Sequence, residues 1–82
     1  MMKSQVFSID SIYVPVKRRA SLDSGKVQMI AESIMETGQK APILVRRDGD
    51  RFVLIEGLHR LEACRSLGEK SILGYLVEAR RH

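Results

Sequence analysis

The chain has 82 residues, of which 44% are hydrophobic and 29% are charged, so we expect one folded domain over residues 1–82 and not a disordered chain. No apolar run approaches the roughly 18 residues that span a bilayer, and the start MMKSQVFSID lacks the apolar core of a secretory signal. The single cysteine, Cys64, excludes an internal disulfide. Together these features predict a cytoplasmic protein without a membrane partner.

Basic residues are in excess and clustered. Lys and Arg number 14 against 10 Asp and Glu, which gives a formal net charge of +4. This balance favours a nucleotide, a nucleic acid or an acidic protein face as partner, although solvated charges also keep small domains soluble. The last basic cluster is expected to be a frayed tail. The clusters are Lys17-Arg18-Arg19, Arg46-Arg47 with Arg51, and Arg80-Arg81-His82.

The first half of the chain predicts a strand, a basic loop and a helix. Residues 5–12 alternate loosely between apolar and polar, which indicates a short strand that ends in a turn. Pro15 biases its neighbours away from helix, so the segment that leads into the first basic cluster is expected to be extended. Asp23 or Ser24 is expected to cap a helix over residues 26–37. The apolar face of this helix is formed by Val27, Ile30, Ala31, Ile34 and Met35.

The second half predicts a hairpin, a helix and a last strand. Asp48-Gly49 is a hairpin signal between a strand that begins at Ile43 and a return strand over residues 51–56. The return strand is apolar throughout its middle, so both of its faces are expected to be buried, as in a central strand. A helix over residues 58–67 and a strand over residues 71–77 follow. The order β-loop-α-β-β-α-β predicts an α/β (α+β) fold, with a small mixed β-sheet covered by two helices.

The stretch FVLIEGLHRLEACRSLGE, residues 52–69, places polar residues where a strand turns into a helix. The first turn of a helix has unpaired N–H groups and a partial positive charge, so it binds anions readily. Gly57 lets a ligand approach the backbone, and His59 and Arg60 add side-chain donors in the first turn. The corner therefore predicts a phosphate-binding site.

Each residue of this corner also has an ordinary structural interpretation. His59 suits a surface histidine, and Arg60 suits an outward helix residue paired with Glu56 or Glu62. Glu56 is a candidate catalytic base or metal-bridging carboxylate, or a strand-end residue that caps the helix. Cys64 lies on the apolar stripe, where cysteine behaves as a small hydrophobe. No cluster of carboxylates is spaced to hold a pair of metal ions, so no metal site is predicted.

Several blocks in register resemble the N-terminal domain of the plasmid and chromosome partitioning protein ParB, in the fold group that it shares with sulfiredoxin. The spacing between the blocks matches that family over nearly the whole chain. The blocks are Arg19 after a proline-containing strand exit, Ile30–Ile34 followed by Gly38, Pro42–Arg46, Leu54–Arg60, and Ala63 with Leu67-Gly68.

The resemblance implies a nucleotide site. In ParB the corresponding glycine-initiated motif binds the triphosphate of CTP, with Mg²⁺ bound by a neighbouring segment. Gly57, His59 and Arg60 match three positions of that motif, and Arg19, with Arg18 beside it, matches the basic loop that faces the nucleotide. The family also implies DNA binding, a role in DNA partitioning or transcription-related regulation, and pairing into homodimers.

The chain departs from the family at several points. Leu58 replaces the glutamate that usually follows the glycine, and Glu62 replaces a later arginine. The chain ends before the family's next nucleotide- and magnesium-binding segment and its helix-turn-helix domain, which weakens the expectation of CTP hydrolysis and of sequence-specific DNA reading. Sulfiredoxin-like proteins carry their reactive cysteine at the position of Leu58, so sulfiredoxin chemistry is not expected.

Three hypotheses follow. The first is a stand-alone ParB-like domain that binds a nucleotide or nucleic-acid phosphate at Gly57-Leu58-His59-Arg60. The second is a small phosphotransferase or nuclease-type enzyme that uses Glu56 near the phosphates. The third is a non-catalytic protein-interaction module whose basic surface meets an acidic partner.

Overall fold

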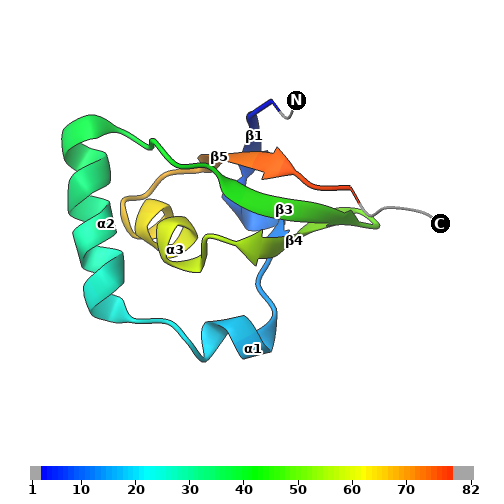
Figure 1. Cartoon of the computed structure of the whole chain (residues 1–82), viewed down its shortest axis with the longest axis horizontal. Coiled ribbons are helices and arrows are strands. Elements are labelled where there is room, and N and C mark those ends of the chain that lie inside the picture. The colour runs from blue at the N-terminus through cyan, green and yellow to red at the C-terminus, as the bar shows by residue number, and fades with distance from the viewer. Residues whose placement is uncertain (1–2, 79–82) are drawn as a thin grey trace.

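The computed structural model describes residues 3–78, so the basic tail Arg80-Arg81-His82 lies outside the described residues. Over this range the chain forms three helices, a 3-10 turn and five strands (Figure 1). In chain order they are β1 (Gln5–Ser8), η1 (Ile9–Ser11), β2 (Ile12–Tyr13), α1 (Val16–Arg19), α2 (Ser24–Thr37), β3 (Ile43–Asp48), β4 (Arg51–Glu56), α3 (Leu58–Ser66) and β5 (Ser71–Leu76).

The five strands form one sheet in the order β1-β5-β3-β4-β2. The pairs β1–β5 and β3–β4 are antiparallel, whereas β3–β5 and β2–β4 are parallel, so the predicted mixed sheet is confirmed. The hairpin predicted at Asp48-Gly49 joins β3 to β4. Strand β4 lies inside the sheet, between β3 and β2. Its consecutive residues Val53 and Leu54 point to opposite faces of the sheet, and both are buried.

The two longer helices, α3 and α2, form successive layers beside the sheet. Helix α3 lies against the sheet and α2 packs against α3 (Figure 1). The expected inward stripe of α3 is buried at Leu58, Leu61 and Cys64, while Leu67 follows the helix and is half-buried. The core consists of apolar side chains from the sheet, η1, α3 and the segment after β2: Phe7, Ile9, Ile12, Val14, Ile43, Val45, Leu54, Leu58, Leu61, Cys64 and Ile72.

The basic loop expected at Lys17-Arg18-Arg19 is instead the short helix α1, and the extended segment expected before it ends at Pro15 because Val16 is already helical. The carbonyl of Pro15 accepts hydrogen bonds from the N–H groups of Arg18, at 2.9 Å, and Arg19, at 3.2 Å. Proline restricts the residue before it, but its own preset φ suits the start of a helix. The first basic cluster therefore lies on a helical turn.

Helix α2 begins two residues earlier than predicted. Oδ1 of Asp23 accepts hydrogen bonds from the N–H groups of Gly25, at 2.9 Å, and Lys26, at 3.3 Å, so Asp23 is the N-cap. The buried face of α2 is narrower than the spacing of its apolar residues indicated, because Met35, which was expected on that face, is 73% exposed. Helix α2 packs on α3 along one side, which leaves residues at the margin of the stripe in solvent.

Gly57 fixes how closely the start of α3 approaches the sheet. Its φ of 112° lies in the left-handed region, and a Cβ at this position would come within 2.6 Å of Cγ2 of Ile43. The sequence suggested that this glycine leaves room for a ligand. The structure shows that the side chain of Ile43 fills the space that a Cβ would need, which gives Gly57 a packing role. Its role at a ligand site stays a prediction.

Substitution of Gly57 by alanine is expected to destabilise the domain by about 3 kcal/mol, since it adds backbone strain to a clash in the core. The matched control is Gly68→Ala, because Gly68 also has a positive φ, of 78°, but a Cβ added there would meet no atom within 4 Å. Gly68→Ala should lower the free energy of unfolding by about 1 kcal/mol. Urea unfolding measures both values, and equal losses would contradict the packing role of Gly57.

Candidate functional site

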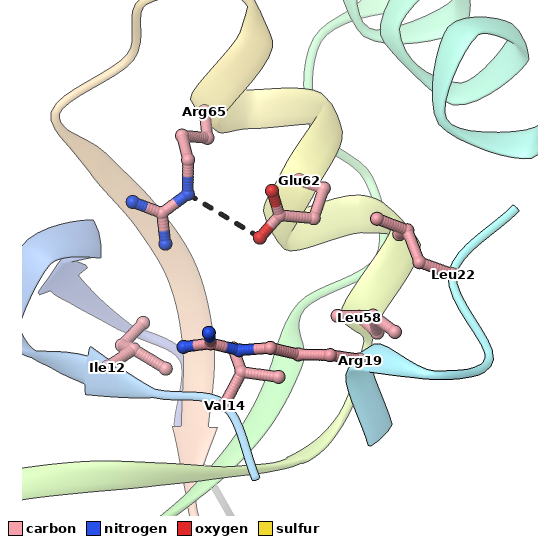
Figure 2. A pocket seen from close by; sticks show the side chains of 7 residues that line it. All are labelled: Ile12, Val14, Arg19, Leu22, Leu58, Glu62 and Arg65. Atoms are coloured by element: carbon pink, nitrogen blue, oxygen red, sulfur yellow. Dashed lines mark ion pairs between the residues drawn. The ribbon is translucent and has the colours of Figure 1, made fainter. Parts of the chain in front are cut away.

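A cavity of about 350 Å³ opens between the α1 region and α3. Its walls are apolar and its rim carries two guanidinium groups and one carboxylate (Figure 2). Figure 2 shows the side chain of Arg19 extending across the cavity, with Arg65 and Glu62 on α3 opposite it. The lining residues are Ile12, Val14, Arg19, Leu22, Leu58, Glu62 and Arg65.

Helical spacing explains why three of these residues share one wall. Leu58, Glu62 and Arg65 are four and three positions apart on α3, so their side chains lie on one face of the helix. The opposite wall comes from the end of α1 and the turn after it. Arg19 ends α1, its carbonyl accepts a hydrogen bond from the N–H of Leu22 at 3.2 Å, and both residues line the cavity.

The charges around the cavity are partly balanced. Nε of Arg65 lies 3.5 Å from Oε2 of Glu62, and its Nη1 lies 3.9 Å from Oδ1 of Asp10. Both pairs are long and reach solvent, so they hold Arg65 only weakly. Arg19 forms no ion pair within residues 3–78. The cavity therefore presents one guanidinium without a counter-ion and a second that a stronger anion can recruit.

His59 lies beside this cavity and contacts the loop before α2. Its Nε2 accepts a hydrogen bond from the backbone N–H of Asp23 at 3.0 Å. The ring is half-buried, and it does not line the cavity. Its predicted role as a phosphate donor stays a prediction, and in this arrangement only Nδ1 carries a proton to donate.

Arg60 is separated from the cavity by the turn of the helix. It lies about 200° around α3 from Leu58, because each residue advances the helix by about 100°. Its guanidinium is close enough to Cys64, one turn further on, to act on the thiol electrostatically. Arg18 and Glu56 are exposed and do not line the cavity. Of the side chains predicted to bind phosphate, the structure thus brings Arg19 alone to the cavity beside α3.

Arg65 and Leu22 line the cavity although neither was expected at the site, and Glu62 has a different partner from the expected Arg60. The structure pairs Glu62 with Arg65, and it forms no ion pair with Arg60 within the described part of the chain. The signal for Arg65 was present, since it lies seven positions, or about two helical turns, after Leu58. No local signal identified Leu22, because its place depends on how the α1–α2 loop folds back onto α3.

Burial raises the pKa of the Cys64 thiol above its ordinary value near 9.0. The negative charge of Glu69 raises the pKa further, and the guanidinium of Arg60 lowers it. The thiol therefore stays protonated at neutral pH, as expected of a small core residue, and its nucleophilic form is scarce.

Among residues 3–78, no three His, Cys, Asp or Glu side chains gather closely enough to hold a metal ion. Over the same range, every helix is too short or too polar to cross a bilayer.

The arrangement of sheet and helices defines a fold shared by sulfiredoxin and ParB. Sulfiredoxin from Arabidopsis thaliana superposes with a TM-score of 0.84 and 27% identity, over 94% of this chain and 86% of that one. The ParB protein of Caulobacter crescentus, solved with CTP-γ-S, superposes with a TM-score of 0.81 and 23% identity, over 95% of this chain and 46% of that one.

Sequence comparison assigns the family within this fold. Residues 2–81 match the ParB N-terminal domain. A probable chromosome-partitioning protein ParB from Campylobacter jejuni is 35% identical over 77 residues, which is 93% of this chain and 28% of that protein. The chain belongs to the ParB N-terminal domain family, and it spans less than a third of the length of this relative.

Cys64 should react slowly with a thiol reagent at pH 8, because its buried thiol is mostly protonated and shielded. Unfolding in urea should speed the reaction by an order of magnitude or more. Since Cys64 is the only cysteine, a stopped-flow DTNB assay of folded and unfolded chains reads it directly. Equal rates in both states would contradict the assignment of Cys64 to the core.

The same pKa shift predicts a pH dependence of stability. A group whose pKa is raised on folding contributes stability that is present below its unfolded pKa, near 9.0, and is lost as pH rises through the folded pKa. The free energy of unfolding should therefore fall more steeply above pH 9 in the wild type than in Cys64→Ala. The free energy of unfolding of each protein is measured by urea titration at several pH values. If it falls equally with pH in the wild type and in Cys64→Ala, the thiol does not contribute to the pH dependence of stability.

Proposed function

We propose that this domain binds the phosphate groups of a nucleoside triphosphate such as CTP in the cavity at the first turn of α3. One observation carries the proposal: Arg19 and Arg65, from separate elements, face one cavity beside a helix N-terminus. The unpaired N–H groups of that turn and the two guanidinium groups are suitable donors for phosphate oxygens.

The apolar part of the cavity completes the site. Small-molecule sites are mostly apolar cavities of about 300–1,000 Å³ with a few polar groups that orient the ligand, and this cavity, of about 350 Å³, lies within that range. Ile12, Val14, Leu22 and Leu58 supply the apolar contacts, and the arginines supply the orientation. In this proposal Arg60 and Arg18 act at longer range, by adding positive charge around the first turn of α3.

Relatives support a nucleotide as the ligand. The Caulobacter crescentus ParB was solved with CTP-γ-S, and its fold is that of this chain. Any Mg²⁺ would be bound mainly by the nucleotide's phosphates, as is usual for this ion at nucleotide sites. Membership in the ParB family extends the proposal to DNA partitioning as the biological setting.

Calorimetric titration with CTP, ATP, GTP and UTP in Mg²⁺ tests the proposal. Wild type should bind at least one of them, and Arg19→Ala should weaken that binding about tenfold, since it removes a charge-assisted hydrogen-bond donor. The control is Arg46→Ala, because Arg46 is also exposed but does not line the cavity. A short DNA duplex is titrated in parallel. Heats from the duplex alone, or equal affinities for wild type and Arg19→Ala, would contradict nucleotide binding in this cavity.

Glu62→Gln should strengthen nucleotide binding about two- to fivefold. The carboxylate of Glu62 pairs with Arg65 at the cavity rim, so it competes with the ligand's phosphates for the same guanidinium. Glu36→Gln on the exposed face of α2 makes the same charge change away from the cavity and should have little effect. The two variants are compared at low and moderate salt, and an equal effect of both would show that Glu62 acts only through net charge.

A further inference from the structure

The wall of the cavity that carries Arg19 and Leu22 is not held by the core. Every residue from Val16 to Lys26 is exposed, and helix α1 buries no side chain. Burial of apolar side chains is the main force that fixes a segment in place, and none of these eleven consecutive residues belongs to the buried core. Something other than core packing must set the position of this segment against α3.

His59 supplies a tertiary hydrogen bond to this segment. Its Nε2 accepts from the N–H of Asp23 at 3.0 Å, across 36 positions of sequence. Within residues 3–78, this is the only hydrogen bond that joins residues 20–23 to α3 or the sheet. Asp23 is also the N-cap of α2, so the bond joins the first turn of α3, the loop and the start of α2 at one point.

We propose that His59 is a positioning residue: its bond to Asp23 holds the α1–α2 loop against α3, so that Arg19 and Leu22 stand opposite Leu58, Glu62 and Arg65. This deepens the proposed function, on which the consequence for ligand affinity rests. The cavity has two walls, one on α3 and one on the loop. The His59 bond sets their separation.

The chemistry of the bond distinguishes this role from direct phosphate contact. An imidazole nitrogen that accepts a hydrogen bond carries no proton, so the proton of the neutral ring is on Nδ1. Nε2 therefore cannot donate to a phosphate while it holds Asp23. A side chain that accepts at the same place preserves the bond, whereas one that only donates breaks it. Glutamine is of the first kind and arginine is of the second.

The bond itself is tested by NMR on the domain without ligand. An N–H···N hydrogen bond transmits a scalar coupling between its two nitrogens, so the wild type should show coupling between the amide nitrogen of Asp23 and Nε2 of His59. NOEs between the methyl groups of Leu22 and Leu58 report the loop position. They should persist in His59→Gln and weaken in His59→Ala and His59→Arg. Absence of the coupling, or unchanged NOEs in all three variants, would overturn the proposal.

Affinity for the nucleotide is the second readout. His59→Ala and His59→Arg should each weaken CTP binding roughly two- to tenfold, the net value of one hydrogen bond, and His59→Gln should restore most of it. If His59 contacted phosphate directly, the His59→Arg variant would bind CTP at least as tightly as the wild type. That order of affinities would overturn the proposal. Dispersed amide spectra confirm that each variant is folded. If wild type binds no nucleotide, the proposed function fails, and the coupling and NOEs still decide the role of His59.

Discussion

The contact of Ile43 with two glycines is the constraint on which the rest of this domain depends. The side chain of Ile43, which is 1% exposed, fills the space that a Cβ would need at Gly57, and a Cβ at Gly74 would come within 3.0 Å of its Cγ1. Gly57 begins α3 and Gly74 lies on β5, so one side chain of β3 fixes a helix and a neighbouring strand. A side chain at either glycine would displace α3 from the sheet or β5 from β3.

The placement of α3 determines which of its residues face the cavity. Because Gly57 sets the start of the helix against β3, Leu61 and Cys64 enter the core, and the face of Leu58 and Arg65 turns toward α1. That half of the site rests on a rigid, buried element. The half that carries Arg19 rests on an exposed segment, which gains its position from a polar contact and not from burial.

Local signals were enough to predict most elements of this fold. The Asp48-Gly49 turn, the apolar run of the return strand and the helical spacing of apolar residues predicted β3, β4 and α2, and the order of the elements predicted the mixed sheet. Local signals failed where a residue's role depends on distant partners. Pro15 was expected to bias both of its neighbours away from helix, although it restricts only the residue that precedes it. Gly57 was identified as special, but its contact with Ile43 is tertiary. The family resemblance implied that Arg19 faces the ligand, whereas Arg65, which lies opposite it on α3, emerges only from the folded arrangement.

We propose that the ligand binds in the cavity between the α1 region and α3. Titration of ¹⁵N-labelled domain with CTP and Mg²⁺, followed by amide chemical shifts, tests it most directly. If the nucleotide binds there, the largest shifts map to Arg19, Leu58, Glu62 and Arg65, on both walls of the cavity. Shifts confined to the basic β3–β4 hairpin, residues 46–51, or no shifts at millimolar nucleotide, would contradict it.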